Sequence, residues 1–363
     1  MQAEKTKHQK AVQVLSDLQE KKFKMIFFTP DSKHVPSGAV IEIYNQAMVM
    51  RRNGYDAYIM TASSDYEVPA YLDQDVQALP HLHADVENLP IAASDWLIIP
   101  EHSTPLMQQT RDLSCGRIVL AQSYDYIITS NIPGMTWRDM GIENVVVTSE
   151  RMKKFVNEWH GNGRYDIQTY TLGIPDYFKP ADFKQPIVSF YTRNTNDIIK
   201  LNKLFYLRFP ELRWVVFEDL RDSTRAEFAE KLGKSAVTVW IDRIASFGQT
   251  AIEAMAAGSI PIALAPDIIP EYMDENTGVW TNDFYQIPEL IGKLIKMWMQ
   301  DLIPQELTDG MAQVAAAHSA AISDATILDA YTHFLDKRIK DVTEAITVAK
   351  IEEEEVAKLN VNR

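Results

Sequence analysis

The order of apolar and polar residues predicts strands that alternate with helices. Residues 24–29 are a short apolar run followed by Pro-Asp, as in a buried parallel strand that ends in a loop. Apolar residues then recur at helical spacing over 40–48, and this helix is predicted to end at Asn53-Gly54. A strand at 55–60 completes a strand–helix–strand unit of the length that a right-handed crossover needs.

The alternation continues in two blocks separated by a segment rich in turn formers. Strands are predicted at 96–99, 118–121 and 145–148 in the first block, and at 187–191, 214–217, 237–240 and 260–264 in the second. Between the blocks, residues 173–186 contain several Gly, Pro and Asp residues, which favours a domain boundary there. The pattern predicts two α/β domains, each with a parallel sheet covered by helices on both faces.

The chain ends are predicted to be helical, and neither reads as a membrane segment. A short helix is expected at 11–18 and a longer one at 331–359, where the run Glu352–Glu355 reads as a solvated face. The first ten residues lack the apolar stretch of a secretory signal or membrane span. The single Cys115 cannot form an internal disulfide, and no Cys/His spacing indicates a zinc site, so a reducing cytoplasm is expected.

Composition and charge narrow the classes of function. Hydrophobic residues make up 46% of the 363 residues and charged residues 24%, which is typical of a globular protein with a sizeable core. The formal charge of −14 argues against a general coat for nucleic acids or anionic membranes, because such surfaces need a basic excess. A local basic cleft is still compatible with it.

Two loops carry candidate anion-binding chemistry. The loop that precedes the helix at 40–48 contains Ser37-Gly38, where a glycine lets a ligand approach the free N–H groups of the helix. The alternative is that these two residues merely start the helix. A second polar turn, 246–250, leads into a helix that carries Glu253. Its backbone donors suit a phosphate, while Glu253 suits sugar hydroxyls, so a phosphorylated sugar would satisfy both features.

The segment 245–261 resembles the signature of the retaining GT-B glycosyltransferases related to family 4. That signature reads Glu-Gly-Phe-Gly, three further residues, then Glu-Ala-Met-Ala-x-Gly-x-Pro, and its spacing is kept throughout. Looser similarities occur at 37–38, 98–102, 119–124, 145–155, 170–178 and 189–194, so the resemblance covers about residues 24 to 300.

The resemblance implies two Rossmann-like domains facing across a cleft. The N-terminal acceptor domain would comprise 1–178, and the C-terminal domain that binds the nucleotide sugar would comprise 186–319. Helices of 320–363 would return to pack on the first domain. No cofactor or metal is implied, because basic side chains and a helix N-terminus take the metal's place, and the donor is a nucleotide diphosphate sugar.

The resemblance also implies roles for individual residues. Gly38 would lie near the donor diphosphate, and the guanidinium of Arg193 would bind it. Glu253 would hold the nucleotide ribose, and the turn comprising Phe247, Gly248, Gln249 and Thr250 would cap the phosphates. Lys200 is the candidate for a lysine that usually follows the arginine, although it comes later than the common spacing.

One position departs from the family pattern. The first glutamate of the signature, which contacts the donor sugar, is Ala245 here. Either the donor sugar differs, or another residue such as Asp242 substitutes, or transfer has been lost.

His102 and Asp125 are the candidate catalytic residues. Both follow predicted strand ends, which is the edge where open α/β sheets bind ligands.

The first hypothesis is therefore a cytoplasmic enzyme that transfers a sugar from a UDP- or GDP-linked donor to a hydroxyl, with retention. The acceptor is a glycan, a protein, a small molecule or a modified DNA base of the kind that phage enzymes decorate. The alternative, motivated by Ala245, is a catalytically silent glycosyltransferase-like subunit that binds a partner. An epimerase of the same architecture is disfavoured, because its catalytic acidic and His pattern is missing.

Overall fold

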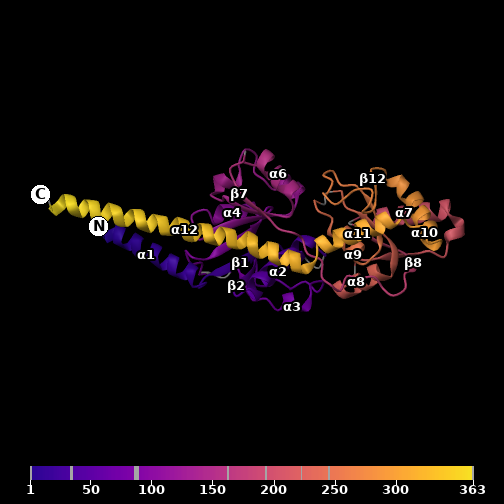
Figure 1. Ribbon diagram of the computed structural model, residues 1–363, viewed down its shortest axis with the longest axis horizontal. Helices are drawn as coiled ribbons and strands as arrows, with labels where there is room; N and C mark the ends of the chain where they lie inside the picture. Colours follow the sequence, from indigo (N-terminus) through magenta and orange to yellow (C-terminus); the bar gives the residue numbers. More distant parts are fainter. Residues whose placement is uncertain are drawn as a thin grey trace.

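The computed structural model describes residues 2–32, 36–85, 90–161, 163–192, 194–221, 223–243 and 246–361, with side chains from His8 to Ile351. Two parallel β-sheets lie along the long axis of the molecule, each with helices on its faces (Figure 1). The predicted α/β fold with two sheets is confirmed.

The first sheet has seven strands in the order β3-β2-β1-β4-β5-β6-β7. Its strands are β1 (Lys24–Phe28), β2 (Asp56–Thr61), β3 (His81–His83), β4 (Trp96–Pro100), β5 (Gly116–Ala121), β6 (Asn144–Val147) and β7 (Asp166–Thr169). Its helices are α2 (Gly38–Arg52), α3 (Gln74–Gln77), α4 (Thr104–Gln109), α5 (Tyr124–Thr129), α6 (Glu150–Trp159) and the 3₁₀ helix η1 (Trp137–Met140). Separate apolar clusters cover its two faces, which is why β4 and β5 are buried along their whole length.

The second sheet has five strands in the order β12-β11-β10-β8-β9. Its strands are β8 (Gln185–Thr192), β9 (Val216–Asp219), β10 (Ser235–Ile241), β11 (Ile260–Leu264) and β12 (Val279–Thr281). Its helices are α7 (Thr195–Arg208), η2 (Pro210–Leu212), α8 (Arg225–Lys234), α9 (Gln249–Ala256), η3 (Phe284–Gln286), α10 (Ile287–Met299) and α11 (Gln305–Ala317). One apolar cluster joins β8, β10 and β11 to α7, α9 and α10.

The last helix, α12 (Ala320–Val361), runs back along the first sheet. Tyr331 packs edge-on against Phe27 of β1, with ring centroids 5.5 Å apart, and its hydroxyl donates to Gln46 of α2 at 2.6 Å. Helix α1 (Gln2–Gln19) lies against α12, and both extend beyond the first sheet (Figure 1). No described helix is both long and apolar enough to cross a membrane.

Several element boundaries differ from the prediction. The strand expected at 214–217 is Val216–Asp219, because the chain makes the 3₁₀ turn η2 first and leaves Trp214 44% exposed. The first helix starts at Gln2 rather than near 11, because α12 supplies a packing partner that local periodicity does not show. The short strands β3, β7 and β12 carry polar residues and were not predicted.

Candidate functional site

A cleft with a cavity volume of about 180 Å³, open to solvent on one side, lies between the two sheets. Its walls are the segments that follow the carboxyl ends of strands from both sheets. Gly38 and Ser123 belong to the first sheet's side, while Tyr191, Asp242 and the start of α9 belong to the second. This is the edge at which parallel α/β sheets bind ligands.

The turn before α9 is held in a left-handed backbone conformation. Gly248 has a φ of 75°, and a Cβ there would lie 2.5 Å from both the Trp240 ring and the Tyr272 hydroxyl. The Tyr272 hydroxyl donates to the Gly248 carbonyl at 3.0 Å, which fixes the turn. Gln249 and Thr250 open the helix and line the cleft. The N-terminus of α9, with its free N–H groups, therefore faces this space.

Gly38 lies directly opposite this turn. A Cβ on Gly38 would lie 2.8 Å from Oε1 of Gln249, so a larger residue at position 38 would collide with the Gln249 side chain on the other side of the cleft. The Ser37 hydroxyl accepts from the Val40 N–H at 3.4 Å and so caps α2. Ser37 therefore starts the helix, as one interpretation of this loop expects, and Gly38 lines the cleft, while its role towards a ligand stays a prediction.

Glu253 lies in the cleft wall and forms a buried ion pair. Its Oε1 accepts from Nη2 of Arg225 at 2.7 Å, and the two side chains are 2% and 9% exposed. The Arg225 guanidinium lies 4.8 Å above the Phe178 ring. Burial alone would lower the pKa of Arg225, but Glu253 and Tyr177 outweigh it and raise that pKa. Arg225 also lines the cleft and was missed by the sequence reasoning.

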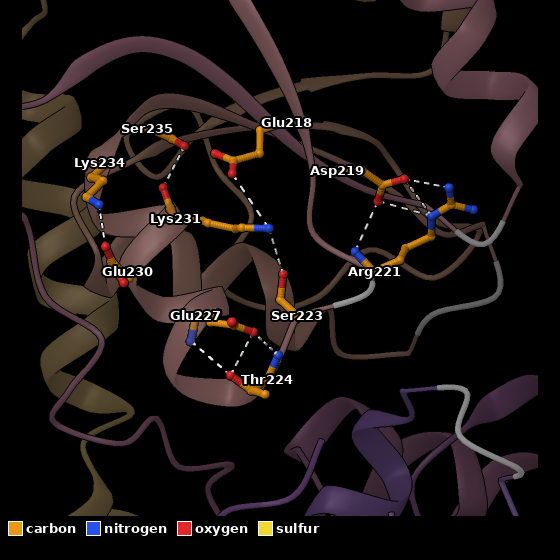
Figure 2. Close-up of polar contacts among 10 residues, drawn as sticks. All are labelled: Glu218, Asp219, Arg221, Ser223, Thr224, Glu227, Glu230, Lys231, Lys234 and Ser235. Atoms are coloured by element: carbon orange, nitrogen blue, oxygen red, sulfur yellow. Dashed lines mark hydrogen bonds and ion pairs between the residues drawn. The ribbon is translucent and has the colours of Figure 1, made fainter. Parts of the chain in front are cut away.

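Polar contacts surround the start of α8, the helix that carries Arg225 (Figure 2). Thr224 and Glu227 form a reciprocal capping box at the start of α8, so Arg225 is the first residue of the helix. Lys231 of α8 donates to Ser223 at 3.0 Å, and the Arg221 guanidinium pairs with Asp219 at the end of β9. In the sequence, the Thr224–Glu227 capping box indicates that a helix starts at Arg225. It does not indicate that the side chain of Arg225 enters the cleft.

Two hydrogen bonds join the two sides of the cleft. The Tyr124 N–H at the start of α5 donates to the Ser246 hydroxyl at 2.8 Å, in a buried position. The Tyr191 hydroxyl donates to the Pro36 carbonyl at 3.3 Å. Ser246, which belongs to the signature, therefore contacts the first sheet's side of the cleft.

The candidate catalytic residues lie beside the cleft rather than among the residues that line it. His102 is half-buried, its ring lies 5.6 Å from the Tyr126 ring, and burial lowers its pKa. Asp125 is in the first turn of α5, between the cleft-lining Ser123 and Tyr126. Their catalytic roles stay predictions.

Glu101, which precedes His102 at the end of β4, makes a structural contact that the sequence did not predict. It is 3% exposed, and its Oε1 accepts the Ser123 N–H at 2.8 Å. Burial raises the pKa of Glu101 to about 7, although N–H donors at Glu101, Gln122 and Ser123 favour the charged form. This carboxyl thus supports the loop that carries Ser123 into the cleft.

Two of the remaining predicted residues, Arg193 and Ala245, lie outside the described residues, and their roles stay predictions. Lys200 is exposed on α7 and is not among the residues that line the cleft. Within the described ranges, no three His, Cys, Asp or Glu side chains are grouped so that they could hold a metal ion.

Two parallel α/β sheets that face each other across such a cleft are the architecture of the GT-B glycosyltransferases. The chain matches no protein-family profile. It is 24% identical over 252 residues to an α-1,6-glucosyltransferase of Actinobacillus pleuropneumoniae serotype 7 (strain AP76), which covers 64% of this chain and 72% of that protein.

Solved structures share the fold. Sucrose-phosphate synthase from Thermosynechococcus elongatus superposes with a TM-score of 0.62 at 13% identity, over 87% of this chain and 100% of that one. The pneumococcal O-GlcNAc transferase GtfA, solved with UDP and GlcNAc, gives a TM-score of 0.62 at 10% identity, over 87% and 99% of the two chains. The GT-B fold is confirmed, and the sequence relative belongs to the predicted class of enzyme, the glycosyltransferases.

Proposed function

We propose that this protein is a glycosyltransferase that transfers a sugar from a nucleotide diphosphate donor to a hydroxyl acceptor. The observation that carries the proposal is the meeting of three features in one cleft. They are the N-terminus of α9, the bare backbone at Gly38 opposite it, and the buried carboxylate of Glu253. The first two suit a diphosphate and the third suits a ribose.

The donor proposed first is UDP-glucose. The sequence relative is a glucosyltransferase, and the fold relative GtfA was solved with UDP. A GDP-linked sugar is the second choice, because nothing in the cleft geometry distinguishes the bases. The nucleotide would lie against the second sheet, with Glu253 at its ribose and the turn 247–250 at its phosphates.

The chemistry that the site must supply is stabilisation of a departing diphosphate. N–H groups at the start of α9 and the guanidinium of Arg193 would bind the charge that develops on the leaving oxygen. Such donors replace the metal ion that other transferases use. Closure of the cleft would exclude water from the transferred sugar, and the contact between Tyr124 and Ser246 joins its two sides.

The acceptor would approach from the first domain's side, past Ser123 and Tyr126. His102 and Asp125 are the proposed groups that orient or deprotonate its hydroxyl. Retention of the anomeric configuration and a cytoplasmic location rest on the family resemblance and the cysteine content. A glycan, protein, small-molecule or modified DNA hydroxyl all fit this proposal.

The second candidate is a silent glycosyltransferase-like subunit, and Ala245 is the observation that favours it. An alanine cannot accept a hydrogen bond from the donor sugar, so that contact must come from a different residue or be absent. Asp242 lines the cleft and is the proposed substitute.

The test has two parts. Melting temperatures are first measured with UDP, GDP and ADP, because a ligand that binds only the folded protein raises the melting temperature. Release of nucleotide is then followed with the matching nucleotide sugars, with Glu253→Gln as the control variant. Nucleotide binding and turnover that Glu253→Gln weakens support the enzyme. Absence of both with every donor refutes the enzyme and leaves the silent subunit.

A further inference from the structure

We propose that Arg225 is a positioning residue for the nucleotide site: it holds one oxygen of Glu253 so that the other oxygen faces the ribose hydroxyls. This inference rests on the proposed function and adds to it a residue that neither the signature nor the family resemblance contains. Arg225 comes from α8 and Glu253 from α9, so the pair joins two helices at the cleft wall.

In this pair, only one of the two carboxylate oxygens of Glu253 accepts a hydrogen bond from a described residue. Oε1 of Glu253 accepts from Arg225 at 2.7 Å, while no described residue donates a hydrogen bond to Oε2. A ribose presents two neighbouring hydroxyls, both of which can donate to a carboxylate. The oxygen that Arg225 leaves open is therefore the acceptor for these hydroxyls.

Arg225 is itself fixed, which a positioning residue must be. Its guanidinium lies 4.8 Å above the Phe178 ring and 5.9 Å from the Phe228 ring. The capping box of Thr224 and Glu227 sets the start of α8 and hence the direction in which Arg225 leaves the helix. These contacts hold the guanidinium in place before any nucleotide binds, which lowers the entropic cost of forming the site.

One donor of Arg225 is unused. The side chain is 9% exposed, and its Nε is buried without a hydrogen-bond partner among the described residues. An unpaired buried donor is costly, and this cost is added to that of keeping Arg225 beside Glu253. The retention of such a side chain in the cleft wall is consistent with a role in holding Glu253.

The test compares nucleotides that differ only at the ribose. Calorimetry gives the affinities of UDP, GDP and ADP and of their 2′,3′-dideoxy forms for the wild type and for Arg225→Met, Arg225→Lys and Glu253→Gln. We expect the wild type to bind the ribose form of its nucleotide roughly 10-fold more tightly than the dideoxy form. Arg225→Met should reduce this preference to about 2-fold, as Glu253→Gln should, and Arg225→Lys should give an intermediate value.

Folding of each variant is checked by circular dichroism, because removing one member of a buried ion pair is destabilising. Should Arg225→Met fail to fold, Arg225→Lys and the charge-free double variant Arg225→Met/Glu253→Met provide the comparison. A purely structural role for Arg225 would weaken both nucleotide forms equally and keep their ratio. That result overturns the inference.

The outcomes separate the inference from the function on which it rests. Wild-type protein that binds none of the three nucleotides overturns both. Wild-type protein that binds a nucleotide without preferring the ribose form overturns the ribose site and with it the role of Arg225, but not nucleotide binding. A ribose preference that survives in Arg225→Met overturns the role of Arg225 alone.

Discussion

Replacing Glu101 by Gln should flatten the pH dependence of stability. Glu101 is 3% exposed at the end of β4, and burial raises its pKa from 4.5 to about 7. Between these two values the folded protein binds a proton that the unfolded chain has released. The free energy of unfolding therefore falls as the pH rises through this range, and the stabilising contribution is lost above pH 7.

The magnitude follows from the same two values. At about 1.4 kcal/mol for each pH unit, the interval from 4.5 to 7 corresponds to roughly 3 kcal/mol, most of which falls between pH 5 and pH 8. Glutamine fits the site, because its Oε1 can still accept the Ser123 N–H that Glu101 accepts at 2.8 Å. The variant cannot ionise, so this share of the pH dependence should disappear.

Urea denaturation at pH 5, 6, 7 and 8 measures the effect. From pH 5 to pH 8, the free energy of unfolding of the wild type should fall by roughly 2 to 3 kcal/mol more than that of Glu101→Gln. Glu42 on α2 gives an independent second test, because burial raises its pKa to about 7 as well. Glu42→Gln should therefore remove a similar share of the pH dependence of the free energy of unfolding. Equal slopes for the wild type and Glu101→Gln would refute the reasoning.

Three further substitutions test the cleft. Arg193→Ala should weaken nucleotide diphosphate binding by roughly 1.5 to 3 kcal/mol in calorimetry, since a charge-assisted hydrogen bond is lost; unchanged affinity counts against its role. Ser246→Ala should lower the free energy of unfolding by about 1 to 3 kcal/mol in urea, because the Tyr124 N–H stays buried without its acceptor, and an unaltered midpoint would contradict this. Ala245→Glu should change which nucleotide sugar is turned over, and an identical donor profile would show that residue 245 does not face the sugar.

The fold was predictable where burial leaves a continuous apolar run in the sequence. Both faces of β4 and β5 are covered, so their residues are almost all apolar and the strands are readable. The edge strand β3, which reads His-Leu-His, has no such run, because its pairing with β2 depends on the sheet rather than on its own side chains.

The candidate site was predictable only where one contiguous motif carries it. Gly248 and Glu253 share a turn and a helix, so their proximity follows from local structure. Arg225 comes from a different helix, and an arginine in a helical first turn reads as a solvated charge until the tertiary fold places it on Glu253. His102 and Asp125 follow strand ends as expected, but strand ends alone do not determine whether a side chain enters the cleft.

A crystal structure of the protein with its nucleotide tests the central claim most directly. The nucleotide is whichever of UDP, GDP and ADP raises the melting temperature most. The account predicts a diphosphate between Gly38 and the N–H groups that open α9, with the ribose at Glu253. A nucleotide bound elsewhere, or bound in the cleft with its phosphates away from α9, would contradict it.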